Sequence, residues 1–156
     1  MAIIKSPRLF HVIEMGQLDL AYNAYTHEMI NLSIRTMLEE LQPNLYEESL
    51  IRLVDFGHEL GHIIESLAKF NILHGEFVGI GMAMSSFLAH LKGVLSRSDM
   101  EHIFNCILSL GLLIYTDEYN CCNAHIPWNK IRTEGIEHKD GMLHLAVPEA
   151  VGQAPS

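Results

Sequence analysis

The stretch that decides the fold reads Gly57-His58-Glu59-Leu60-Gly61-His62 and continues, after a short gap, with Leu73-His74-Gly75-Glu76. His58 and His62 are four residues apart, so on a helix they lie on one face about one turn from each other. His74 opens the next apolar segment, and a hairpin of two helices would bring it back to the same face. Imidazole is the commonest metal ligand in proteins, so this spacing indicates a site for a divalent cation.

The segments that carry these histidines have the apolar patterns of two packed helices. Over Glu47–Lys69 the apolar residues recur close to the 3.6-residue period, which predicts one helix across the range. From Gly75 to about Lys92 the chain is apolar nearly all round, as expected for a buried central helix. Gly57 and Gly61 each cost about 1 kcal/mol relative to Ala inside a helix, so their position beside histidines suggests close packing or ligand access.

The rest of the chain predicts further helices and little β structure. No repeat, linker or low-complexity tract divides it, so we expect one all-α domain over residues 1–156. A short strand is expected near the C-terminus, over Met142–Val147. Four other helices are expected. One begins at Ser6-Pro7, and a second runs over Thr26–Leu41. A third begins at a capping box at Ser98-Asp99-Met100-Glu101, and the last begins at Pro127.

The composition excludes several classes of protein. Of the 156 residues, 49% are hydrophobic and 19% are charged, which is inconsistent with a disordered chain. Ten Lys and Arg against nineteen Asp and Glu give a net charge of −9, so nucleic acid is not an expected partner. The longest apolar stretch, Ile103–Tyr115, is too short to span a membrane, and no targeting segment is visible. Three cysteines, an odd number, indicate a reducing compartment, so we expect a cytoplasmic protein without a membrane partner.

The segment from His58 to His62 also matches H-E-x-x-H, the zinc peptidase pattern. In that interpretation both histidines bind zinc, and Glu59 is the general base for a metal-bound water. The extended form of the pattern needs a Gly and a third His where this chain has Glu65 and Ala68. Glu65, one turn beyond His62, either orients that ring or is simply solvated, and the second interpretation is favoured. A zinc metallohydrolase therefore stands as the alternative.

Over a longer range, Gly57-His58-x-x-Gly61-His62 and Leu73-His74-Gly75-Glu76-x-Val78-x-Ile80-Gly81-Met82 resemble the 3-dehydroquinate synthase family. Its relatives are the sugar phosphate cyclases, which include 2-deoxy-scyllo-inosose and 2-epi-5-epi-valiolone synthases. The resemblance extends to both sides. Leu38–Glu47 with Arg52–Gly57 looks most like the cyclases that act on sedoheptulose 7-phosphate, and His138–Gly152 resembles the closing segment of the family.

The resemblance implies the helical C-terminal domain of the dehydroquinate synthase-like fold and an enzyme of the carbon–oxygen (phosphate) lyase class. By analogy, His58 and His74 bind a divalent metal, with zinc as the first choice and cobalt as the second, while His62 lies near the substrate and helps proton transfer. Arg52 and Asp55 are equally consistent with an ordinary surface pair. The expected substrate-binding residues are Arg52, Asp55 and Lys139.

The implied reaction depends on the metal and on NAD⁺. Phosphate is eliminated from a phosphorylated ketose, such as sedoheptulose 7-phosphate or DAHP, and an intramolecular aldol step closes the ring. Subfamily signals conflict, because Gly61-His62 resembles the dehydroquinate and inosose enzymes whereas Asp55 resembles the valiolone enzymes.

The chain also departs from the family pattern. In the family, the third metal ligand is a Glu that stands three residues before a Lys. Met1–Lys5 resembles the family segment that follows this motif. The Glu and the Lys would therefore both lie upstream of Met1. A glycine-rich nucleotide loop is not found either, and no residue is assigned to NAD⁺. We therefore expect the NAD-binding α/β domain to be absent and the isolated chain to be inactive alone. It would pair with such a half or with a second copy; a non-catalytic remnant is the other hypothesis.

Overall fold

The structure is a computed structural model that describes residues 1–17, 24–46, 48–49, 52–67, 73–115 and 144–155. Over these ranges the regular structure is helical, and the all-α prediction is confirmed. The α helices are α1 (Pro7–Gly16), α2 (Thr26–Leu41), α3 (His58–Leu67), α4 (His74–Leu91) and α5 (Arg97–Ser109), and the 3₁₀ helices are η2 (Gln42–Asn44) and η3 (Leu53–Asp55).

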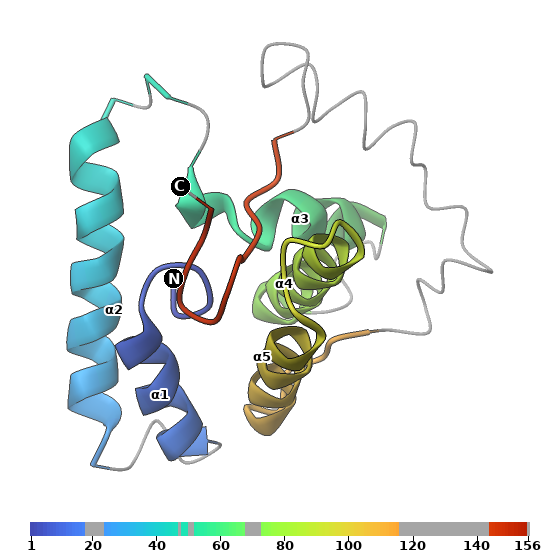
Figure 1. The fold of residues 1–156 in the computed structure, drawn as a ribbon. Helices are drawn as coiled ribbons and strands as arrows, with labels where there is room; N and C mark the ends of the chain where they lie inside the picture. The colour runs from blue at the N-terminus through green and yellow to red at the C-terminus, as the bar shows by residue number, and fades with distance from the viewer. Residues whose placement is uncertain (18–23, 47, 50–51, 68–72, 116–143, 156) are drawn as a thin grey trace.

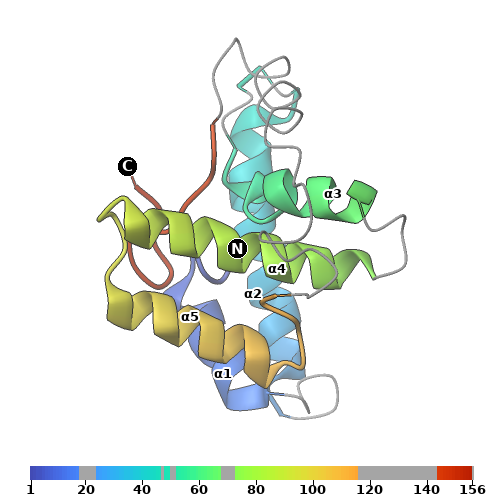
Figure 2. The ribbon, with the colours of Figure 1, turned by 90° about the vertical axis from the view of Figure 1, so that its right-hand side faces the viewer.

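The helices form two groups with the C-terminal segment between them. In Figure 1, α1 and α2 lie on the left, α3, α4 and α5 lie on the right, and the red C-terminal segment passes between the two groups. The side view shows α3, α4 and α5 as successive layers (Figure 2). Helix α4 contacts both α3 and α5, and α1 contacts both α2 and α5. The backbone N–H of Gly152 donates to the Ile3 carbonyl at 2.8 Å, which ties the C-terminal segment to the N-terminal turn.

Helix α4 is the central helix, as the apolar pattern predicts. Phe77 is fully buried, and it joins Ile64 and Ile80 in a small cluster between α3 and α4. A larger cluster connects the N-terminal turn, α1, α4 and α5. Burying a large apolar side chain stabilises a fold by about 1.5–3 kcal/mol, so these clusters fix α4 between its neighbours. The buried residues of α4 are Phe77, Gly79, Ile80, Gly81, Ala83, Ser85, Ser86 and Ala89.

The single helix predicted over Glu47–Lys69 is wrong. Among the described residues of this range, the chain forms the short η3 and then begins α3 only at His58. Gly57 separates the two with a φ of +83°, in the left-handed region that costs other residues about 1–2 kcal/mol. The apolar period continues across this break, which is why the pattern alone did not reveal it.

The helix starts agree with the sequence in one case and differ in another. At α1, the Ser6 hydroxyl accepts a hydrogen bond from the Leu9 N–H at 3.1 Å, as the Ser6-Pro7 signal predicts. At α5, the prediction of Ser98 as the capping residue is wrong by two positions. Ser96 caps the helix, and its hydroxyl accepts from the Asp99 N–H at 3.0 Å. Both serines precede an acidic residue at the spacing of a capping box, so the motif by itself did not distinguish them.

The strand predicted over Met142–Val147 is wrong for its described part. Residues 144–147 have no strand partner, and the Ala146 N–H instead donates to the Glu59 carboxylate at 3.2 Å. The β structure in the described ranges is one isolated antiparallel bridge between Ala150 and Gln153. Lys139 and the helix expected at Pro127 lie outside the described residues.

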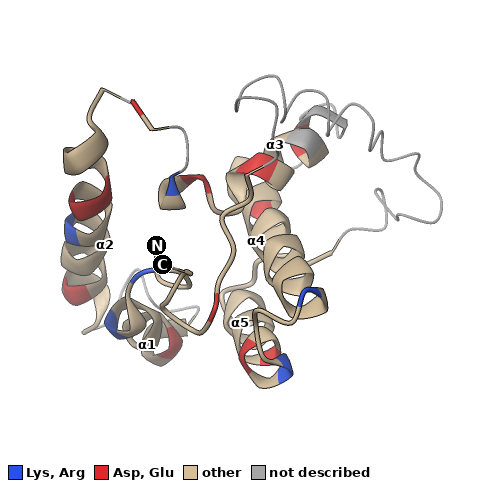
Figure 3. Cartoon of the chain, turned by 45° about the horizontal axis from the view of Figure 1, so that its top comes forward, with Lys and Arg blue, Asp and Glu red and all other residues tan. Residues whose placement is uncertain are grey.

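The described Lys and Arg residues are distributed over several elements (Figure 3). Each of the four described arginines pairs with an acidic side chain: Arg8 with Glu28, Arg35 with Glu39, Arg52 with Asp55, and Arg97 with Glu101. In the part of the chain that the structure describes, no helix has both the length and the hydropathy needed to cross a membrane.

Candidate metal centre

Helices α3 and α4 approach so closely that their backbones are in contact. A Cβ atom placed on Gly81 would lie 2.0 Å from the carbonyl oxygen of Gly57 and 2.8 Å from the backbone nitrogen of Gly61. No side chain fits in that space, so glycine at position 81 is what allows the two helices to meet. This explains the glycines beside the histidines: they serve close packing, and they bring the start of α4 next to α3.

The close approach brings three imidazole rings together. The ring centroids of His58 and His62 are 5.7 Å apart, those of His58 and His74 are 5.7 Å apart, and those of His62 and His74 are 5.4 Å apart. His58 begins α3, His62 follows one turn later, and His74 begins α4. The hairpin that the sequence predicts is therefore formed, and it gathers the three histidines in one cluster.

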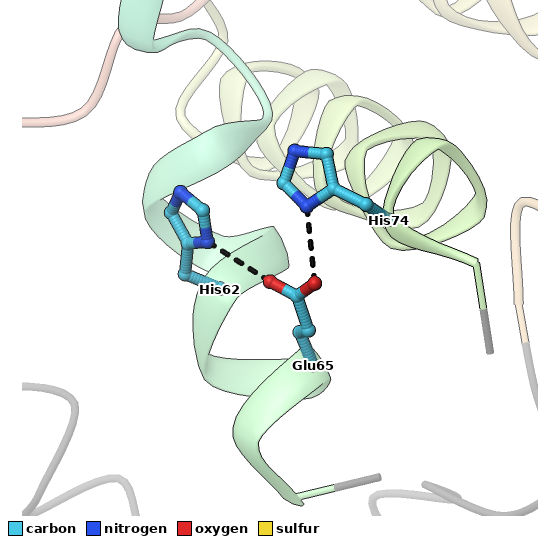
Figure 4. Close-up of side chains that lie close together, drawn as sticks. All are labelled: His62, Glu65 and His74. Atoms are coloured by element: carbon cyan, nitrogen blue, oxygen red, sulfur yellow. Dashed lines mark hydrogen bonds and ion pairs between the residues drawn. The ribbon is translucent and has the colours of Figure 1, made fainter. Parts of the chain in front are cut away.

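Glu65 lies between two of these rings (Figure 4). One carboxylate oxygen is 3.1 Å from Nδ1 of His62, and the other is 3.1 Å from Nδ1 of His74. These two hydrogen bonds lower the pKa of the Glu65 carboxyl, and the bond to His62 contributes more than the bond to His74. The favoured expectation that Glu65 is merely solvated is wrong, since only 17% of its side chain is exposed. The i, i+3 spacing from His62 was the signal that could have identified it.

His58 has a buried ring nitrogen that needs a partner. Its Nδ1 atom has no hydrogen-bond partner within the described residues. Burial lowers the pKa of His58; the His62 and His74 rings lower it further, against the opposing effects of the Phe56 backbone and Asp55. Burying a polar atom without a partner costs about 1–3 kcal/mol, and a bound cation is one way to satisfy such an atom. The lowered pKa favours the neutral form of the ring, which is the form that binds metals.

The donor set fits a borderline-soft divalent metal. One ligand atom each from His62, Glu65 and His74 lies within 4.8 Å of the others, and the His58 ring is adjacent. Imidazole nitrogens with a carboxylate are ligands that zinc accepts, and imidazole also suits other first-row metals. The rings of His62 and His74 are about half exposed, so an ion and a second molecule both have access.

Arg52 and Asp55, two of the expected substrate-binding residues, lie at η3, shortly before the start of α3. Two guanidinium nitrogens of Arg52 contact the Asp55 carboxylate at 2.9 and 3.2 Å, which holds the planar group in one orientation. Arg52 lines an open cavity of about 400 Å³ together with Glu59 and His144 of the C-terminal segment. Among the described residues that line this cavity, none belongs to the histidine cluster. Lys139, the third expected substrate-binding residue, lies outside the described residues.

The contacts of Glu59 bear on the peptidase alternative. Its carboxylate accepts the hydrogen bond from the Ala146 N–H and lines the cavity beside Arg52. Glu59 is not part of the described group whose ligand atoms lie within 4.8 Å of one another. The H-E-x-x-H interpretation needs this carboxylate next to a metal-bound water, and the geometry does not favour it.

Comparison with known families agrees with the histidine motifs. The family model described as 3-dehydroquinate synthase C-terminal matches residues 1–127. The chain belongs to the 3-dehydroquinate synthase family. The resemblance drawn from the motifs is thereby confirmed, as is the assignment to the sugar phosphate cyclases.

Within the 3-dehydroquinate synthase family, the chain is similar to several 2-epi-5-epi-valiolone synthases. It is 36% identical to that of Streptomyces hygroscopicus subsp. jinggangensis over 126 residues, covering 81% of this chain and 30% of the relative. It is 33% identical to one from Actinomyces sp., covering 98% of this chain and 42% of the relative. The chain thus spans well under half the length of these relatives.

Solved structures of the family agree on the fold. The 2-epi-5-epi-valiolone synthase ValA of Streptomyces hygroscopicus subsp. jinggangensis, solved with NAD⁺ and Zn²⁺ bound, superposes with a TM-score of 0.89 at 32% identity over 99% of this chain and 43% of its own. A 2-deoxy-scyllo-inosose synthase superposes with a TM-score of 0.71 at 16% identity over 97% of this chain and 46% of its own, which supports the fold alone.

Proposed function

We propose that this chain is the metal- and substrate-binding part of a sugar phosphate cyclase. The observation that carries the proposal is the cluster of three imidazoles, 5.4–5.7 Å apart, in a fold that matches a zinc-bound valiolone synthase. The substrate class we propose is a phosphorylated ketose of the sedoheptulose 7-phosphate type, because the valiolone synthases match along nearly the whole chain. The reaction is the elimination of phosphate followed by an intramolecular aldol cyclisation.

In this proposal His58 and His74 hold a divalent metal, zinc first and cobalt second. When bound, the metal supplies Lewis-acid polarisation of substrate hydroxyl groups. His58 offers a partly buried ring whose lowered pKa favours the neutral form, and His74 offers a ring that contacts Glu65 through Nδ1. The third ligand would be the family's Glu, which in this chain would lie upstream of Met1.

The remaining residues act on the substrate and its protons. His62 is exposed beside the two ligands and accepts or returns a proton at a ring nitrogen, which is the role of a general base or acid. Arg52 binds the phosphate group, a task for which its planar fork is suited, and Asp55 keeps that fork in place. Lys139 is proposed as a further basic residue for the anionic substrate.

The redox step of the proposed reaction needs a second part. NAD⁺ would supply transient oxidation of a carbinol, and its binding domain would come from a separate half of the enzyme or from a longer form of this chain. The relatives extend well beyond the region that this chain matches, which supports a division of the site between two parts. A second copy of the chain is the alternative partner.

Zinc binding by the purified chain tests the metal site. We expect His58→Ala and His74→Ala each to weaken zinc affinity by at least about tenfold, because each removes one ligand. His11→Ala is the matched control, since this histidine is exposed on α1. Unchanged zinc affinity in His74→Ala would refute the proposed site.

The reaction itself is tested by reconstitution. The chain is mixed with the N-terminal half of the Streptomyces hygroscopicus valiolone synthase, NAD⁺, zinc and sedoheptulose 7-phosphate, and released inorganic phosphate is measured. Phosphate release that is lost in His62→Ala supports the cyclase. Zinc binding without any phosphate release, in a complex shown to form, would favour the non-catalytic remnant.

A further inference from the structure

One carboxylate contacts two imidazoles from two helices. Oε2 of Glu65 lies 3.1 Å from Nδ1 of His62 on the same helix, and Oε1 lies 3.1 Å from Nδ1 of His74 on α4. Each oxygen therefore has its own ring. An ionised carboxylate can only accept hydrogen bonds. In each of the two contacts, Nδ1 of the ring is therefore the donor and carries the proton.

A proton on Nδ1 determines what the other ring nitrogen can do. In a neutral imidazole with Nδ1–H, Nε2 carries the lone pair that binds a metal or accepts a proton. Figure 4 shows that the second nitrogen of each ring points away from Glu65. The lone pairs of His62 and His74 are thus presented on the side of the rings that the carboxylate leaves open.

We propose that Glu65 is a positioning residue that holds both rings in the Nδ1–H form, so that His74 offers Nε2 to the metal and His62 offers Nε2 to the substrate. This inference rests on the proposed function and assigns to Glu65 a task that neither the motif nor the ligand set includes. Metal-binding histidines usually donate their other N–H to a carboxylate or carbonyl, which fixes the tautomer and the ring orientation. Here the same carboxylate also orients the proton-transfer histidine.

The competing assignment makes Glu65 a metal ligand, because its oxygens lie within 4.8 Å of ring nitrogens of His62 and His74. A cation held there by the nearest atoms would replace the two Nδ1 protons and would use Nδ1 on both rings. The two assignments therefore differ in which ring nitrogen carries the metal, and ring-nitrogen NMR distinguishes them.

The first measurement is ¹⁵N NMR of the imidazoles in the full metal-free chain at neutral pH. Signals of His62 and His74 are assigned from His62→Gln and His74→Gln. We expect both rings to show the Nδ1–H tautomer in the unmodified chain. In Glu65→Gln the amide offers one acceptor and one donor, so one of the two rings must change to the Nε2–H tautomer. Glu59→Gln is the matched control, since it removes the same charge from α3 and leaves both contacts intact.

The second measurement is zinc affinity by competition with a chromogenic chelator. Changes to such supporting carboxylates cost about 10–100-fold in metal affinity, and we expect Glu65→Gln to fall in this range. Glu65→Asp keeps the charged acceptor and should recover part of the loss, whereas Glu59→Gln should bind zinc as the unmodified chain does. Circular dichroism and thermal melting confirm that each variant is folded.

Three results would overturn the proposal. They are a bare Nδ1 on either ring in the unmodified chain, zinc bound through Nδ1 with Glu65 as a ligand, and unchanged zinc affinity in a folded Glu65→Gln. The last result, with zinc binding still dependent on His58 and His74, would leave the proposed function intact and remove only the role of Glu65. An unmodified chain that binds no zinc would overturn both.

Discussion

Nδ1 of His74 lies 3.1 Å from Oε1 of Glu65, a contact that joins the first residue of α4 to the last turn of α3. The backbones also meet here, because Gly81 of α4 lies against Gly57, which directly precedes α3, and against Gly61 within α3. The candidate metal centre and the packing of the helix pair are therefore one structural unit. Changes to either one are expected to be measurable in the other.

Gly81→Ala should lower the free energy of unfolding. The added Cβ would lie 2.0 Å from the Gly57 carbonyl oxygen, and overpacking of this kind typically costs about 1–3 kcal/mol. Gly75→Ala is the matched control on the same helix, because its Cβ would meet no atom within 4 Å. Alanine there should be neutral or stabilise the chain by up to about 1 kcal/mol. Urea unfolding followed by circular dichroism measures both, and equal stabilities would argue against the backbone contact.

Zinc should raise the melting temperature of the chain. A ligand that binds only the folded state stabilises it by about 2.7 kcal/mol at a concentration one hundred times its Kd. We expect a chelator to reverse the shift and His74→Ala to abolish most of it. His11→Ala should keep the full shift. Thermal melts with and without zinc check this, and an equal shift in His74→Ala would place the metal elsewhere.

Ser96→Ala should destabilise α5 by about 1 kcal/mol, the usual cost of losing a capping hydroxyl. Ser96 accepts a hydrogen bond from the Asp99 N–H at 3.0 Å, whereas Ser98 lies inside the helix. Ser98→Ala should therefore change the free energy of unfolding little. Chemical unfolding of the two variants decides between the capping residue in the structure and the one that the motif suggested. If Ser98→Ala were the more destabilising variant, Ser98 would be the capping residue instead.

Cys106 should resist alkylation in the folded chain. Burial, with a smaller effect of Glu14, raises the pKa of its thiol from 9.0 to about 12, so the reactive thiolate is scarce at pH 8.5. Since the folded pKa is above the unfolded one, this group stabilises the fold below about pH 9 and loses that contribution as the pH rises toward 12. Iodoacetamide labelling mapped by peptide mass spectrometry should leave Cys106 unlabelled until denaturant is added.

Most of the helical framework could be predicted because its signals are local. Pro7 after Ser6 marks the start of α1, and the apolar pattern after Gly75 marks a buried helix. The break at Gly57 was missed because backbone conformation, not hydrophobicity, ends the segment there: its φ is +83° while the apolar period continues. The sequence could not decide between Ser96 and Ser98 as the capping residue of α5, because both satisfy the same spacing rule.

The candidate site was partly predictable for a similar reason. His58 and His62 share a face by helical spacing alone, and the expected hairpin of two helices added His74. The role of Glu65 depends on the distance between two helices, which no local pattern contains. Its bond to His62 follows from i, i+3 spacing, but its bond to His74 exists only because Gly81 lets α4 approach α3.

The contact between Gly57 and Gly81 has a thermodynamic consequence for the metal centre. Because α3 and α4 are packed this closely, moving them apart would expose the core around Phe77. The imidazoles are therefore ordered when the chain folds, and the conformational entropy of arranging them is lost at that stage rather than during metal binding. The centre is preorganised, and its affinity for a cation depends on the rigidity of a backbone contact as much as on the ligands themselves.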